Sequence, residues 1–254
     1  MYKIANWNLE RPKLRSGKTK LALAKLKEIN ADVLVLTETS TAVDLSESYP
    51  FKISTLCYER TPNEHWVTIW SKWEIVKQIE TFDNYRTVSG IIKAPFGSIS
   101  VFGTIIPYHN AGVSGTRYGN LNYKIWEYHE QDLYAQSKNW EQLLVCEKLP
   151  LFVIGDFNQS RFNNQGYGTQ KVRQILSNLL SLLDLKCVTE IDFSEKYLTK
   201  DPKKGKIRNN IDHICVSNSL LSQMTRYEVG AWNHFTEEGQ FMSDHNGVYL
   251  AFEI

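Results

Sequence analysis

The stretch Leu151-Phe152-Val153-Ile154-Gly155-Asp156-Phe157-Asn158 runs from four apolar residues into a glycine, a carboxylate and an amide. A short apolar run that ends in a turn residue is typical of a buried strand. The chain closes on a similar arrangement, because Ser243-Asp244-His245 stands just before the apolar run 247–252. Catalytic residues commonly lie at strand ends and in loops that a rigid sheet holds in place. The two stretches therefore predict one functional site, supplied by distant parts of the chain.

Other apolar strands also deliver polar residues at their ends, and this set is rich in carboxylates, amides and imidazoles. Its members are Asn8, Glu10, Glu38, Asp156, Asn158, Asp212, His213, Asp244 and His245. Carboxylate and amide oxygens are hard ligands that suit Mg²⁺, Mn²⁺ or Ca²⁺ rather than zinc. Asp212 stands on a strand before the final hairpin, from which it could reach His245 and orient its imidazole. We interpret His213 as structural, because neighbouring residues on a strand face opposite sides.

The remaining pattern indicates an α/β fold that uses the whole chain. A helix-like segment follows the first strand, and a series of short strands without intervening helices comes next. We expect strands at 2–9, 32–36, 51–58, 67–70, 73–79, 87–93, 99–106, 151–154, 186–189, 211–216, 224–229 and 247–252, and helices at 18–29, 121–149 and 171–183. Because the polar strand ends come from the first, middle and last strands, residues 1–254 are predicted to form a single domain of two packed sheets with helices outside.

Length and composition agree with a globular domain and indicate its compartment. The chain has 254 residues, of which 42% are hydrophobic and 22% charged, as is ordinary for such proteins. Its apolar runs are too short to span a bilayer, and residues 1–8 lack the apolar centre of a signal peptide. The cysteines stand singly, at Cys57, Cys146, Cys187 and Cys215. We expect buried free thiols and a cytoplasmic location.

The net charge of +1 conceals an uneven distribution. Residues 11–27 carry basic side chains and no acid, and a second basic cluster lies at 200–208 with Asp201 as its one acid. Basic patches attract phosphates. A solvated helix face and a charged loop tip explain the same pattern equally well.

Five motifs taken together resemble one family. They are Trp7-Asn8-Leu9-Glu10, Leu36-Thr37-Glu38, Gly155-Asp156-Phe157-Asn158, Ile211-Asp212-His213-Ile214 and Ser243-Asp244-His245. Their types and order are similar to those of the endonuclease/exonuclease/phosphatase superfamily, and they cover nearly the whole chain. The resemblance implies a four-layer α/β sandwich, in which two mixed β-sheets pack face to face and are flanked by helices.

The resemblance also implies a metal site. In such a site Glu38 would be the main ligand, with Asn8 and Glu10 beside it and Asp244 as a further carboxylate on the metal side. The implied cofactor is Mg²⁺, or Mn²⁺ in its place.

The catalytic residues that the resemblance implies come from the same motifs. Asp156 would align or activate the attacking water, and Asn158 would position the phosphate or the water. His245 would contact the phosphate and take its orientation from Asp212.

The chain departs from the family at the end of the strand 101–106, where members usually place a Tyr or a His. Tyr108, His109 and Asn110 follow this strand, and our choice among them is His109. The aromatic that apurinic endonucleases carry just before the strand of the Asp212 type is missing. Trp232 and Phe235 could supply a stacking surface instead, although a role in packing or in a substrate loop explains them more simply.

The other histidines and tryptophans are expected to be structural. We predict surface positions for His65, His129 and His234. Large aromatic side chains dominate cores, so we predict core positions for Trp66, Trp70, Trp73, Trp126 and Trp140.

The leading functional hypothesis is a metal-dependent phosphoesterase that hydrolyses phosphodiester bonds in nucleic acid. One alternative keeps the chemistry and changes the substrate to a small or lipid phosphoester, as in inositol phosphatases and sphingomyelinases. The other is a non-catalytic binding module, because a fold does not guarantee a function. No oligomeric state is predicted.

Overall fold

The computed structural model describes residues 1–115, 121–162, 166–191, 193 and 210–254. Within them the strands form two six-stranded sheets. The first sheet has the order β11 (Arg226–Trp232), β12 (Gly247–Glu253), β1 (Tyr2–Asn8), β2 (Val33–Ser40), β4 (Glu64–Ser71), β3 (Phe51–Ser54). The second has the order β5 (Ile75–Ile79), β6 (Thr87–Ala94), β7 (Gly97–Ile105), β8 (Leu151–Asp156), β10 (Asp212–Ser217), β9 (Leu185–Cys187).

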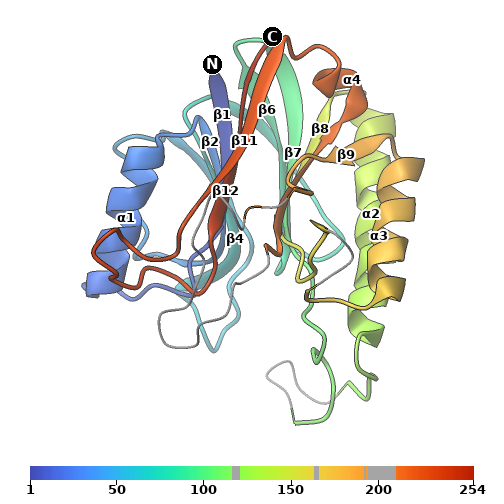
Figure 1. The fold of residues 1–254 in the computed structure, drawn as a ribbon, viewed down its shortest axis with the longest axis horizontal. Helices are drawn as coiled ribbons and strands as arrows, with labels where there is room; N and C mark the ends of the chain where they lie inside the picture. Colours follow the sequence, from blue (N-terminus) through green and yellow to red (C-terminus); the bar gives the residue numbers. More distant parts are fainter. Residues whose placement is uncertain (116–120, 163–165, 192, 194–209) are drawn as a thin grey trace.

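Both sheets are mixed, and helices cover their outer faces. The pairs β1–β2 and β7–β8 are parallel, whereas the other neighbours are antiparallel. Helix α1 (Gly17–Ile29) packs on the first sheet, and α2 (Glu127–Glu147) and α3 (Gln170–Leu182) pack on the second (Figure 1). A short helix, α4 (Asn218–Leu221), follows β10. This arrangement confirms the predicted four-layer α/β sandwich.

Alternation along β1 explains how one strand serves both the core and the site. Ala5 and Trp7 pack beneath α1, whereas Ile4 lies in the core between the sheets. Asn6 and Asn8 follow Ile4 at two-residue intervals, so they share its face. Both amides reach the second sheet.

Strands β8 and β10 of the second sheet also carry core residues and site residues on one face. Phe152 and Ile154 of β8 lie between the sheets, and Asp156 takes the next position on the same face. Asp212 begins β10 and pairs with Asp156 in the antiparallel register, while Ile214 continues into the core. The end of the apolar core is thus also the place where two carboxylates meet.

Gly155, just before Asp156, is required by the close approach of β7. Its φ of 153° lies outside the range that side chains favour, and an added Cβ would lie 1.8 Å from the carbonyl oxygen of Thr104. Any side chain at this position would push β8 away from β7 and displace Asp156.

Helix α2 begins at Glu127 rather than at the predicted residue 121. Trp126 has a φ of 71°, in the left-handed region, which ends any helix arriving from before it. The backbone N–H of Trp126 donates to the carbonyl of His109 at 2.8 Å, so a tertiary contact holds this conformation. Lys148, also left-handed, ends the helix near the predicted boundary.

Some predictions of exposure are wrong. His129 and His234 are buried, because His129 bonds to the carbonyl of Pro107 and to Gln159, and His234 bonds to Asn246. Of the tryptophans predicted for the core, Trp73 and Trp126 are only half-buried.

The described cysteines are all free thiols. Cys187 and Cys215 are buried as expected, whereas Cys146 is exposed and Cys57 is half-buried. In the described part of the chain, every helix is too short or too polar to cross a membrane. The basic cluster at 200–208 lies outside the described residues.

Candidate active site

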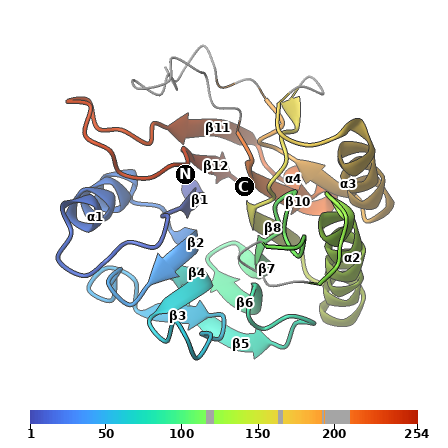
Figure 2. The ribbon, with the colours of Figure 1, turned by 90° about the horizontal axis from the view of Figure 1, so that it is seen from below.

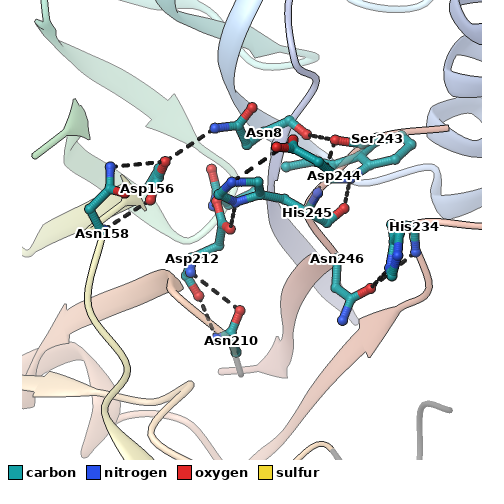
Figure 3. Close-up of polar contacts among 12 residues, drawn as sticks. Asn8, Asp156, Asn158, Asn210, Asp212, His234, Ser243, Asp244, His245 and Asn246 are labelled. Atoms are coloured by element: carbon teal, nitrogen blue, oxygen red, sulfur yellow. Dashed lines mark hydrogen bonds and ion pairs between the residues drawn. The ribbon is translucent and has the colours of Figure 1, made fainter. Parts of the chain in front are cut away.

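Three titratable side chains meet at the open end of the sandwich. Asp156 ends β8, Asp212 begins β10, and His245 precedes β12 (Figure 3). One ligand atom from each lies within 4.8 Å of the others, a spacing that could hold a metal ion. Asp156 and Asp212 are 56 residues apart in the sequence, and Asp212 and His245 are 33 residues apart. The pairing of β8 with β10 brings the two carboxylates together, and the pairing of β12 with β1 brings His245 to the same place.

His245 is held in a fixed orientation by Asp212. Its Nδ1 lies 2.5 Å from Oδ2 of Asp212, and the amide of Asn6 donates to the other carboxylate oxygen at 3.1 Å. The indole N–H of Trp7 donates to the backbone carbonyl of His245 at 2.8 Å. Because Nδ1 is occupied, Nε2 is the nitrogen that can face a substrate. The structure thus brings together the pair that the sequence suggested.

Asp156 is surrounded by amide donors. The side chains of Asn8 and Asn158 donate to its Oδ2 at 3.1 and 3.2 Å, and the backbone N–H of Asn158 donates to Oδ1 at 2.9 Å. Asn158 has a φ of 48° and also donates to the carbonyl of Ile106 at 2.9 Å. The carboxylate is therefore fixed from both sheets.

The electrostatics of the group favour a further cation. Burial and the nearby carboxylates of Asp212 and Glu38 raise the pKa of Asp156 to about 8, although His245 opposes the rise. Burial alone would lower the pKa of His245, but Asp212 and Asp156 outweigh it and raise that pKa to about 10. A cation placed beside the group would lower these pKa values and favour the ionised form of Asp156.

The predicted metal ligands lie around this group rather than within it. Glu38 forms an ion pair with Arg11, whose guanidinium lies 4.4 Å from the ring centre of Trp66. Asn8 is buried, and its Oδ1 accepts from the backbone N–H of Glu10 at 3.0 Å. Oδ1 of Asp244 lies 4.0 Å from Nε2 of His245.

Among the predicted metal ligands, Glu10 differs because its carboxylate is paired with a lysine of α1. Its carboxylate lies 2.5 Å from Nζ of Lys18, at the start of α1. Its φ of 51° is left-handed, which redirects the chain after Asn8. The oxygen atoms of Glu38, Asn8 and Asp244, close to Asp156, are hard ligands that fit a divalent cation. For such a cation to bind, Arg11 would have to leave its ion pair with Glu38.

A cavity of about 380 Å³ opens next to the group. Its walls are Tyr167, Asn210, Ile211, Asp212, Asp244, His245 and Asn246. Tyr167 is the functional candidate that the sequence did not reveal, since it stands in a loop between two glycines. Burial, together with the charge of Asp156, raises its pKa to about 12, so its hydroxyl stays protonated.

His109, our choice for the missing family side chain, lies behind Tyr167 and outside the residues that line this cavity. Its Nδ1 lies 2.5 Å from the Tyr167 hydroxyl, and its backbone N–H donates to the same oxygen at 3.1 Å. Trp232 packs against Trp7 with ring centres 5.6 Å apart and is buried, so its role is packing.

Comparison with known proteins assigns the class. The chain belongs to the Endonuclease/Exonuclease/phosphatase family, whose sequence model matches residues 5–245. This membership supports a phosphoesterase, as the five motifs suggested. A search of curated proteins gives no significant match.

Solved structures of the same fold are distant in sequence. An AP endonuclease from Archaeoglobus fulgidus is 15% identical, with a TM-score of 0.69 and full coverage of both chains. The 3′ phosphatase NExo from Neisseria, bound to a product DNA hairpin, is 16% identical, with a TM-score of 0.66 and full coverage of both chains. The endonuclease domain of TRAS1, a telomere-specific non-LTR retrotransposon, is 14% identical, with a TM-score of 0.64, and the match covers 100% of this chain and 99% of that one.

Proposed function

We propose that the protein is a metal-dependent phosphodiesterase that hydrolyses nucleic acid. The observation that carries this proposal is the group of Asp156, Asp212 and His245, of which Asp212 and His245 line the cavity. Family membership supports the phosphoesterase class, and the names of similar structures include DNA-processing enzymes. A cytoplasmic location, in keeping with the free thiols, is part of the same proposal.

The metal we propose is Mg²⁺, with Mn²⁺ as its substitute. Glu38, Asn8 and Asp244 would hold it, and Arg11 would leave Glu38. When bound, such an ion neutralises the charge on phosphoryl oxygens and assists the attacking water.

Asp156 has the properties of a general base. Burial raises the pKa of Asp156, which makes its carboxylate a stronger proton acceptor than a solvated aspartate. Asn8 and Asn158 hold its oxygens by hydrogen bonds, so the carboxylate receives a proton without having to reorient. We assign to it the removal of a proton from the attacking water.

His245 would act on the phosphoryl oxygens. With Nδ1 bound to Asp212 and a pKa raised to about 10, the ring is an imidazolium at neutral pH. Its Nε2–H can donate to a phosphoryl oxygen, and its positive charge stabilises the charge that develops there. Tyr167, protonated and on the same wall, can supply a second donor.

The first test is cleavage of single-stranded DNA, duplex DNA, abasic duplex, RNA and small phosphodiesters, with Mg²⁺ or with EDTA. We expect cleavage of a nucleic acid in Mg²⁺ and none in EDTA. Asp156→Asn keeps the shape of the side chain and removes the base, so kcat should fall about 10³-fold. Activity that survives EDTA or this substitution would falsify the mechanism. If only lipid or inositol phosphoesters were cleaved, the proposed substrate would be wrong and a small phosphoester would take its place. If no substrate were cleaved and calorimetry detected no Mg²⁺ binding, the protein would be a binding module.

A further inference from the structure

A second cavity, of about 510 Å³, lies apart from the residues of the candidate active site. It is lined by Leu56, Phe82, Asp83, Asn84, Tyr85, Arg86, Tyr128, Gln131, Asp132 and Ala135. The sheet register places it at the same end of the molecule as the site. Thr87, which begins β6, pairs with Thr104 of β7, and the next residue of β7 pairs with Asp156. The segment 82–86 therefore extends beyond the sheet at the level of Asp156, on the end that Figure 2 views.

Aromatic rings dominate the walls of this second cavity. Tyr85 stacks on Tyr58 with ring centres 4.7 Å apart and planes 10° from parallel. Tyr128 stacks in the same way on Tyr123, at 5.0 Å and 16°. Phe82 and Tyr85 are 45% and 40% exposed, whereas the ring of Tyr128 also has the guanidinium of Arg86 4.9 Å from its centre. The exposed parts of Phe82 and Tyr85 therefore offer the stacking surface for a flat, unsaturated ring.

The charges of the second cavity exclude a phosphate from it. The guanidinium of Arg86 lies 2.8 Å from Asp83 and 2.7 Å from Asp132. One cation between two carboxylates leaves the wall net negative, which repels an anion. A neutral ring with polar edges is compatible with this wall.

The segment 126–128 links the two cavities along the chain, since Trp126 contacts Tyr167 and Tyr128 lines the second cavity. The ring of Tyr167, on the wall of the first cavity, lies 5.3 Å from that of Trp126. Trp126 stands two residues before Tyr128, in the left-handed conformation that the backbone of His109 holds. Arg60, exposed at the far side, places its guanidinium 5.7 Å from the ring centre of Tyr58, where a backbone phosphate can pair with it.

We propose that the second cavity receives an unpaired nucleobase of the same nucleic acid whose phosphodiester occupies the first. This inference rests on the proposed function and narrows its substrate to a strand that is single-stranded on the β5–β6 side of the site. In a duplex each base is covered by its neighbours and its partner, so its face is closed to Tyr85. A single strand can turn one base into the cavity and keep its backbone at Arg60.

The test measures binding separately from cleavage. Fluorescence anisotropy of labelled single-stranded and duplex oligodeoxynucleotides of equal length gives Kd for the full chain in EDTA. We expect the single strand to bind more tightly, and Tyr85→Ala to weaken its binding about tenfold with little effect on the duplex. Phe82→Ala should act in the same direction. The matched control is Tyr227→Ala, which removes a tyrosine that is 51% exposed near the start of β11, where Tyr227 pairs with Phe252.

Each outcome separates this inference from the proposed function. Equal binding of duplex and single strand, or a Tyr85→Ala protein that binds like the Tyr227→Ala control, overturns the nucleobase cavity even where cleavage is intact. Loss of single-strand affinity in Tyr85→Ala supports the cavity even where no phosphoester is cleaved. A small phosphodiester without a base should be cleaved equally by the wild-type and Tyr85→Ala proteins, since it never reaches the second cavity.

Discussion

Two clusters of buried charge lie at the same end of the second sheet and differ in how their charge is balanced. In the first, Arg86 is held between Asp83 and Asp132, and the amide of Gln136 donates to the remaining oxygen of Asp132 at 2.6 Å. The guanidinium stays charged at every pH that a protein survives. The ion pair of Arg86 and Asp132 joins α2 to the start of β6, so the charges of this cluster stabilise the fold.

In the second cluster, His245 carries the only positive charge opposite Asp212 and Asp156. An imidazole is charged only when protonated, and the pKa of Asp156 is raised to about 8. The carboxylates here are held by amides rather than by a permanent cation. The contrast is that Arg86 carries a permanent charge in the structural cluster, whereas the charges of His245 and Asp156 depend on their protonation.

Breaking the structural cluster should have the largest effect. Arg86→Met leaves Asp83 and Asp132 without their cation, and removing one partner of a buried pair costs about 3–5 kcal/mol. Urea unfolding should show this loss in the free energy of unfolding. Lys77→Met, which breaks the exposed pair of Lys77 and Glu147 at 2.7 Å, should cost less than about 1 kcal/mol. Equal losses in the two variants would contradict the structural role of Arg86.

Breaking the catalytic cluster should show most clearly in turnover. His245→Ala removes the donor to the phosphoryl oxygen, so kcat should fall about 10²–10³-fold, equivalent to about 3–4 kcal/mol of activation free energy. The free energy of unfolding should also fall, because Asp212 is buried and loses the partner of its ion pair. His109→Ala is the matched control, since His109 acts only through Tyr167, and we expect at most about a tenfold loss. A greater loss in His109→Ala than in His245→Ala would reverse the assignment.

The pH dependence of the free energy of unfolding should show a smaller effect than these two substitutions. His129, on α2 between the two clusters, donates from Nδ1 to the carbonyl of Pro107 and accepts from Gln159 at Nε2. Burial lowers its pKa to about 4, against about 6.5 in the unfolded chain. The unfolded state therefore binds the proton first, and stability is lost as the pH falls through this range.

Between pH 7 and pH 5 this term amounts to about 2 kcal/mol. Other groups titrate in the same range, so the measurement is the difference between wild type and His129→Gln, each unfolded with urea at both pH values. The variant should lose less stability on acidification. An identical pH dependence in the two proteins would show that His129 does not stay neutral in the folded state.

Alternation along single strands made much of the fold and site predictable. Ile154 and Asp156 share a face, as do Ile4 and Asn8, so the pattern placed polar side chains at the end of a buried layer before any contact was known. The pairing of Asp212 with His245 followed from the order of the strands. Both sheets and their covering helices also agree with the sequence pattern.

The features that the sequence did not reveal depend on contacts and backbone conformations that no periodic pattern marks. Tyr167 reaches the cavity from a loop, and its hydroxyl bonds to His109, 58 residues away, so no periodic pattern marks it. The start of α2 depends on the bond between Trp126 and His109. Glu10 belongs to a motif, but its backbone conformation and Lys18 turn its carboxylate aside.

The amides of β1 have a consequence for how activity depends on folding. Asn6 and Asn8 belong to the first sheet, yet they donate to Asp212 and Asp156 of the second. Each half of the sandwich thus holds part of the other half's reactive geometry. We therefore expect activity to be lost when the two sheets move apart, even if each sheet keeps its own backbone hydrogen bonds.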